Sequence, residues 1–147
     1  MGWVEDLGGQ LVGLDTAPLI YFMERHPYYH PRVAPFFVAL EQRQLRRVAS
    51  TLCLTEVLVQ PLARKDAALA ARYRRILLGQ RVVDLAEVTA DIASEAARLR
   101  ADFGLRTPDA VHLATALLAG ATTFLTNDGR LARVPGLQVL ILDQLVP

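Results

Sequence analysis

Short apolar runs alternate along the chain with longer segments in which apolar side chains recur every three or four residues. The short runs predict buried strands. Four of these strands are expected at 10–15, 45–51, 121–126 and 137–142, and the run at 81–88 predicts a fifth.

The segment 89–104 shows the most regular helical pattern. Thr89 is placed to cap its start and Gly104 to end it. Its apolar residues fall on one face: Ile92, Ala96, Leu99 and Phe103. Further helices are expected to begin near Ala17, after Thr51, around 63–78 and at Thr107, with Pro108 at the first helical position. Strands that alternate with helices predict an α/β fold, in which a parallel central sheet of four to five strands is covered by helices on both faces.

Size and composition predict one globular domain. The chain has 147 residues, of which 52% are apolar and 21% charged. We therefore expect a single domain over 1–147, in which residues 1–9 form an N-terminal leader. The one cysteine, Cys53, lies in an apolar segment and is expected to be a buried structural thiol.

Nothing in the sequence predicts a membrane protein. The first ten residues contain two acids and no basic residue, unlike a signal peptide. The longest uncharged run, 110–127, is interrupted by Gly120 and is shorter than the roughly 20 apolar residues that span a bilayer. A cytoplasmic protein with no membrane partner is expected.

The charge is nearly balanced, but the basic residues are unevenly placed. The net charge is +1, and all but one of the 16 basic residues are arginines, Lys65 being the exception. Arginines cluster at 42–47 and 71–81. Such clusters indicate either solvated helix faces or a surface for a polyanion, and the second alternative gains weight if several acids are gathered at a metal site.

Four acids stand where the predicted strands end or where the following helices begin. Asp15 closes the first strand and Asp128 follows the strand at 121–126. Glu56 lies in the first turns of the helix after Thr51, and Asp109 is near the start of its helix. Any one of them could be a helix cap, but the carboxyl ends of parallel strands share one edge, where sites form.

Four carboxylates at one edge require a compensating charge. Two carboxylates about 4 Å apart repel by about 4 kcal/mol at an effective dielectric near 20. Oxygen ligands without a Cys or His cluster favour Mg²⁺ or Mn²⁺. The sequence therefore predicts a divalent-cation site at this edge.

Four segments in this order resemble the PIN-domain ribonucleases, in particular the VapC-type toxins of toxin–antitoxin systems. They are LVGLDTAPLIYF, ASTLCLTEVLVQPLA, GLRTPDAVHLATALLAGATTFLTNDGRL and VLIL. The resemblance places the family's acidic cluster on Asp15, Glu56, Asp109 and Asp128. It also matches three small polar residues around that cluster: Thr16, Thr126 and Asn127.

The resemblance implies a metal-dependent endoribonuclease, the toxin of a type II pair, with Mg²⁺ or Mn²⁺ as cofactor. Asp15 and Asp109 are the first choices as ligands, and Glu56 or Asp128 could accept a proton. The implied partners are an RNA substrate, a cognate antitoxin and a second copy of the chain, bound through 17–23 and 57–63. His112 could orient a carboxylate or touch RNA, but a packed structural role is preferred.

Three other classes of protein place acids at strand ends. A receiver domain requires a pair of adjacent acids at an early strand end and a lysine on a late strand; here Asp15 has no adjacent acid, and Lys65 is the only lysine. A phosphatase with an Asp nucleophile requires D-x-D after the first strand, where this chain has LDTAP. A PIN-like module that binds RNA or a partner without turnover stays open as the alternative.

Overall fold

A parallel sheet forms the centre of the computed structural model, which describes residues 2–79 and 83–145. Within these residues five strands lie in the order β3-β2-β1-β4-β5, and each neighbouring pair is parallel. The strands are β1 (Leu11–Leu14), β2 (Arg46–Ser50), β3 (Leu85–Ala86), β4 (Thr123–Thr126) and β5 (Gln138–Ile141). The predicted α/β fold is confirmed.

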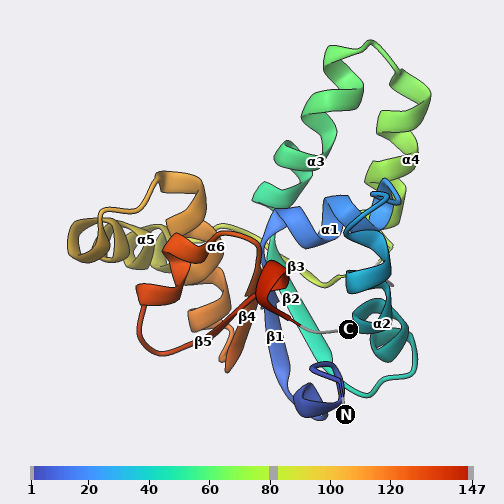
Figure 1. Cartoon of the computed structure of the whole chain (residues 1–147). Coiled ribbons are helices and arrows are strands. Elements are labelled where there is room, and N and C mark those ends of the chain that lie inside the picture. Colours follow the sequence, from blue (N-terminus) through green and yellow to red (C-terminus); the bar gives the residue numbers. More distant parts are fainter. Residues whose placement is uncertain (1, 80–82, 146–147) are drawn as a thin grey trace.

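Helices cover the two faces of this sheet (Figure 1). Figure 1 shows α1 and α2 on one side and α5 and α6 on the other, while α3 and α4 form a hairpin that projects past the sheet. The helices are α1 (Thr16–Met23), α2 (His30–Glu41), α3 (Leu52–Ala63), α4 (Ala67–Leu78), α5 (Ala90–Phe103) and α6 (Thr107–Leu118). Short 3₁₀ turns lie at η1 (Glu5–Leu7), η2 (Gly129–Arg133) and η3 (Leu142–Gln144).

Alternating side chains of the strands fill a separate core on each face. Val12 and Leu14 of β1 pack with α1 and α2, as does Leu125 of β4. Phe124 points to the other core, with α5 and α6. Gly13 faces α6 so closely that an added Cβ would lie 2.4 Å from the Cβ of Ala116. The last turn of α6 therefore packs directly against β1.

The observed elements differ from the predicted ones at three places. The apolar pattern does not predict α2, because Pro31 and Pro35 interrupt it, yet Pro31 lies in the first turn, where a missing N–H costs little. The helix expected at 63–78 begins at Ala67, because Lys65 adopts a positive φ of 57° before the cap. The strand expected at 81–88 is Leu85–Ala86, and residues 81 and 82 lie outside the described residues.

The segment predicted as a leader packs against the domain over part of its length. Val4 and Leu7 are buried in the core beside α2. The ring of Trp3 stacks on Phe36 with centroids 6.1 Å apart. The single-domain organisation over 1–147 stays a prediction. Among the described residues no helix is long and apolar enough to cross a membrane.

Candidate active site

Asp15 is fixed where β1 passes into α1. It caps α1, because its Oδ1 accepts a hydrogen bond from the backbone N–H of Thr16 at 2.9 Å. Its Oδ2 accepts one from the hydroxyl of Thr126, at the end of β4, at 2.6 Å. Burial raises the pKa of Asp15, although the charge of His112 and these hydrogen bonds oppose the rise. The carboxylate is thus rigidly held and short of solvation.

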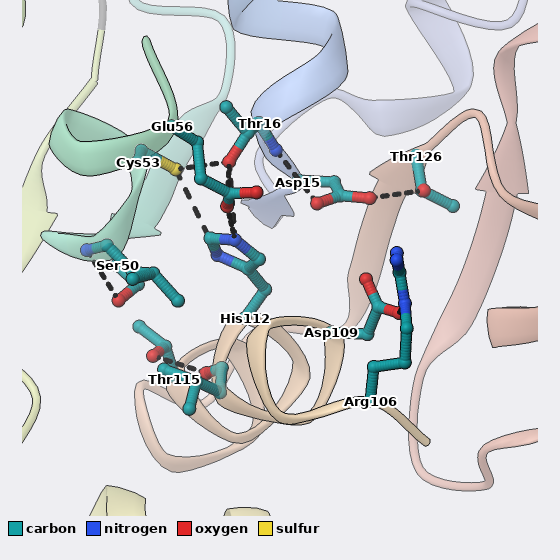
Figure 2. Close-up of polar contacts among 12 residues, drawn as sticks. Asp15, Thr16, Ser50, Cys53, Glu56, Arg106, Asp109, His112, Thr115 and Thr126 are labelled. Carbon is teal, nitrogen blue, oxygen red and sulfur yellow. Dashed lines mark hydrogen bonds and ion pairs between the residues drawn. The ribbon is translucent and has the colours of Figure 1, made fainter. Parts of the chain in front are cut away.

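Glu56 reaches the same place from α3 and is held by a buried network (Figure 2). Its Oε1 accepts hydrogen bonds from the Thr16 hydroxyl at 2.9 Å and from His112 Nε2 at 2.5 Å. The Thr16 hydroxyl also lies 3.2 Å from Cys53 Sγ. Cys53 is fully buried, as expected of a structural thiol.

His112 and Glu56 form an ion pair. Burial alone would lower the pKa of His112, but hydrogen bonds with Cys53 and Glu56 and the charge of Asp15 raise it to about 10. The hydrogen bond from His112 in turn lowers the pKa of Glu56. At neutral pH the imidazolium therefore faces a carboxylate.

Asp109 lies in the first turn of α6 and is buried, with 8% of its surface exposed. It pairs with Arg106, whose Nε lies 3.2 Å from Asp109 Oδ2. Figure 2 shows this pair across the site from Asp15. The start of α6 therefore places both a carboxylate and a guanidinium group at the site.

Asp128 follows β4 and caps the turn η2, accepting from the backbone N–H of Arg130 at 3.0 Å. The guanidinium of Arg130 also lies 2.6 Å from its Oδ2. These hydrogen bonds, the side-chain one first, lower the pKa of Asp128. Its own backbone N–H donates to the hydroxyl of Thr126 at 3.0 Å. Thr126 thereby connects Asp128 with Asp15.

The four predicted acids line a single pocket of about 330 Å³. They come from the ends of β1 and β4 and the first turns of α3 and α6, so the strand-edge rule placed them correctly. Thr16 and Asn127 also line the pocket, together with Arg106. Thr126 lies behind it, in contact with Asp15. The roles of these residues as ligands or catalysts stay predictions.

The chemistry of the pocket fits a hard divalent cation, since carboxylate oxygens are the ligands that Mg²⁺ and Mn²⁺ prefer. The arrangement is not a ready-made cage: among residues 2–79 and 83–145, no three His, Cys, Asp or Glu side chains are grouped to hold an ion. Asp109 and Asp128 are instead engaged by Arg106 and Arg130. Asp15 and Asp109 could hold such a cation once Arg106 moves aside from Asp109.

Sequence reasoning missed two cations of the site, Arg106 and Arg130, and preferred a packed role for His112. His112 is buried, as a packed residue would be, but it also contacts Glu56, 56 residues away in the chain, as in the alternative in which it orients a carboxylate. Arg106 precedes Asp109 by three residues and Arg130 follows Asp128 by two. Pairing at helical spacing was a usable signal for Arg106. No local pattern connects His112 with Glu56.

Comparison with known proteins finds solved structures with a similar fold. A toxin–antitoxin complex from Klebsiella pneumoniae is 26% identical over 91% of this chain and 98% of that chain, with a TM-score of 0.64. VapC20 from Mycobacterium tuberculosis, a sarcin-ricin loop cleaving toxin, is 18% identical over 88% and 98% of the two chains, with a TM-score of 0.69. FitAcB from Neisseria gonorrhoeae is 18% identical over 91% and 99%, with a TM-score of 0.65.

The structural neighbours at 18% identity show a shared fold, and the resemblance to VapC-type proteins is confirmed. Comparison with curated proteins gives no match. The family model of the PIN domain matches residues 12–137, which include all four acids of the pocket. The chain belongs to the PIN-domain family.

Proposed function

We propose that the chain is a metal-dependent endoribonuclease and the toxin of a type II toxin–antitoxin pair. The observation that carries the proposal is the convergence of Asp15, Glu56, Asp109 and Asp128 on one pocket. Membership of the PIN-domain family and the likeness to a toxin–antitoxin complex and to a loop-cleaving toxin support it.

Asp15 and Asp109 hold the cation in this proposal. When bound, the cation lowers the pKa of a water ligand and offsets charge on the phosphate. Burial raises the pKa of Asp15, with a smaller contribution from the charge of Asp109. A cation held by Asp15 and Asp109 would offset the cost of burying the Asp15 charge and the repulsion between the two carboxylates. Asp15 is also held by two hydrogen bonds, so it would bind without reorganising.

Glu56 and Asp128 orient the attacking water or complete the ligand set. Both have lowered pKa values, caused by His112 and by Arg130, and are therefore weak proton acceptors at neutral pH. Hydrogen bonds from Thr16 and His112 hold Glu56 at Oε1, and no described residue donates to its second oxygen. We assign that oxygen to the water or the cation, and the released proton to solvent.

Cleavage of total RNA by the purified chain tests the proposal. Cleavage is expected with Mg²⁺ or Mn²⁺ and not in EDTA, and the variant Asp109→Asn, purified in parallel, should be inactive. The Asp109→Asn sample also controls for contaminating nucleases. RNA binding by the parent without any cleavage in Mg²⁺ or Mn²⁺ would instead favour the alternative, a PIN-like binding module.

The toxin role predicts a cognate antitoxin. A structure similar to this chain is a complex of a toxin with its antitoxin, which supports the proposal. Expression of the chain alone should arrest growth, and Asp109→Asn should relieve the arrest. Co-expression of the product of an adjacent short reading frame should relieve it as well. Unchanged growth on expression of the soluble, active parent would contradict the toxin role.

A homodimer through 17–23 and 57–63 also belongs to the proposal. Val59 and Leu62 on α3 expose 51% and 58% of their surface, which supports an apolar contact there. Light scattering at micromolar concentration should give a dimer for the parent and a monomer for Leu62→Glu. A monomeric parent would contradict this part.

A further inference from the structure

Three arginines lie along one side of the acidic pocket. A second, smaller pocket of about 30 Å³ adjoins the first and shares Arg106 and Asp109 with it. Arg130 and Arg133, from the turn η2, also line the smaller pocket. The carboxylates of the acidic pocket therefore border directly on a cluster of guanidinium groups.

The two arginines that pair with the acids are exposed to solvent. The side chains of Arg106 and Arg130 are 69% and 61% exposed, so water competes for both pairs. Arg130 contacts both carboxylate oxygens of Asp128, through its Nε and one terminal nitrogen. Arg106 uses only its Nε on Asp109, and its terminal nitrogens have no hydrogen-bond partner among the described residues. Arg133 is exposed and forms no ion pair within residues 2–79 and 83–145.

A divalent cation held by Asp109 and Asp128 would compete with the guanidinium groups for these carboxylates. Arg106 and Arg130 would then lose their partners but stay beside the pocket. A guanidinium presents a fork of N–H donors that matches two phosphate oxygens.

We propose that Arg106, Arg130 and Arg133 form a phosphate-binding subsite for the RNA backbone, and that cation binding releases Arg106 and Arg130 from Asp109 and Asp128 to fill it. The subsite rests on the proposed function, because it assumes that the acids bind a cation and that the ligand is RNA. In this subsite the arginines would hold the RNA backbone next to the cation. Such phosphate contacts do not depend on the base sequence.

Substitution of each arginine by glutamine tests the exchange. Arg98→Gln is the matched control, because Arg98 pairs with Glu95 at the same three-residue spacing on α5, where it does not line either of these pockets. The probe is a labelled single-stranded RNA oligonucleotide, followed by fluorescence anisotropy in Ca²⁺ over a range of KCl, with gels to show that the RNA stays intact. A second titration measures Mn²⁺ binding without RNA.

Arg106→Gln and Arg130→Gln should weaken RNA binding about tenfold and lower the slope of log K against log [KCl] by about one each, as loss of a phosphate contact does. Both should bind Mn²⁺ more tightly than the parent, because a competitor for the carboxylates is gone. Arg133→Gln should weaken RNA binding but leave Mn²⁺ affinity unchanged. Arg98→Gln should change neither.

Two results would overturn the subsite. In the first, Arg106→Gln and Arg130→Gln bind RNA as Arg98→Gln does, which reduces the arginines to counter-ions of the acids. In the second, Arg98→Gln weakens RNA binding as much as they do, which shows only a general effect of charge. If the parent cleaves RNA but either result holds, the subsite fails and the proposed function stands. If the binding results are as expected and the parent never cleaves RNA, the subsite stands and the proposed function fails.

Discussion

The two halves of the acidic pocket are held in different ways. Asp15 and Glu56 are fixed by Thr126, Thr16 and His112, which are 0%, 4% and 2% exposed. Asp109 and Asp128 are held by two arginine side chains that are more than half exposed. The carboxylates themselves do not follow this division, because Asp109 is buried and the Glu56 side chain is 38% exposed.

The two halves differ in whether folding fixes the partners of their carboxylates. The partners of Asp15 and Glu56 have lost their freedom as part of the core, so those oxygens are in place before any ligand arrives. The partners of Asp109 and Asp128 are exposed side chains that can move into solvent. The cost is small for Arg106, which makes a single contact, and larger for Arg130, which contacts both oxygens of Asp128. One half is therefore preorganised, and the other exchanges its partner.

The largest effect on RNA cleavage is expected from substitution of Asp15, the proposed cation ligand in the preorganised half. Asp15→Asn keeps the cap and the shape but removes a ligand charge, so cleavage should fall about a thousandfold or more. Initial rates on a labelled RNA measure it. Asp66→Asn is the matched control, because Asp66 caps α4 as Asp15 caps α1, and it should cleave like the parent. Cleavage by Asp15→Asn within tenfold of the parent would remove Asp15 from the site.

Of the three cations at the site, His112 should contribute most to the free energy of unfolding. His112→Ala opens a cavity and deprives Glu56 of its partner, so the free energy of unfolding should fall by about 2–4 kcal/mol. Urea unfolding in EDTA measures the loss. His112→Gln, which retains an N–H donor, should recover part of it. Equal stability of His112→Ala and the parent would show that the buried network does not hold this half.

The same network should respond to pH. The pKa of His112 rises from 6.5 to about 10 on folding, so its contribution to stability is complete below pH 6.5 and is lost as the pH rises through about 10. Between these values the parent should lose stability relative to His112→Gln, whose side chain does not titrate. Thermal unfolding of both proteins over this range measures the difference. Parallel curves would contradict a charged His112.

The exchangeable half should show the smallest effect on stability. Arg106→Gln removes an ion pair whose arginine is exposed and whose Asp109 is buried. Because glutamine can still donate to Asp109, the loss should be about 0–1 kcal/mol, like that of the control Arg98→Gln. Urea unfolding of the two variants side by side measures it. A loss for Arg106→Gln as large as that for His112→Ala would show that both halves are fixed and would abolish the contrast between them.

The sequence predicted the sheet and the meeting of the acids, because both follow from local patterns. Thr89 does cap α5, by accepting from the N–H of Ile92, and Gly104 ends it with a φ of 65°. Parallel strands then bring Asp15 and Asp128 to one edge, and the helix starts add Glu56 and Asp109. Periodicity and a topological rule were sufficient for this.

What the sequence did not predict depends on contacts between distant segments. The helix α2 was hidden by two prolines, although Val33, Phe36 and Phe37 are buried by the tertiary structure. The contact of His112 with Glu56 requires the packing of α6 beside α3, which neither segment encodes alone. Arg106 and Arg130 lie outside the two arginine clusters of the sequence and were not singled out, because their pairing depends on side-chain direction.

Binding of Mn²⁺ to the folded chain, followed as a shift in melting temperature, tests most directly that the four acids form one cation site. The parent should melt at a higher temperature with Mn²⁺ than in EDTA, and the shift should be much smaller for Asp109→Asn. In EDTA, Asp109→Asn should melt at the parent's temperature or above, because the substitution relieves repulsion among the carboxylates. Asp91→Asn, which removes the first-turn acid of α5, should shift like the parent. If Asp109→Asn melts lower in EDTA and responds to Mn²⁺ as fully as the parent, Asp109 is only a helix-terminal carboxylate and the shared cation site is contradicted.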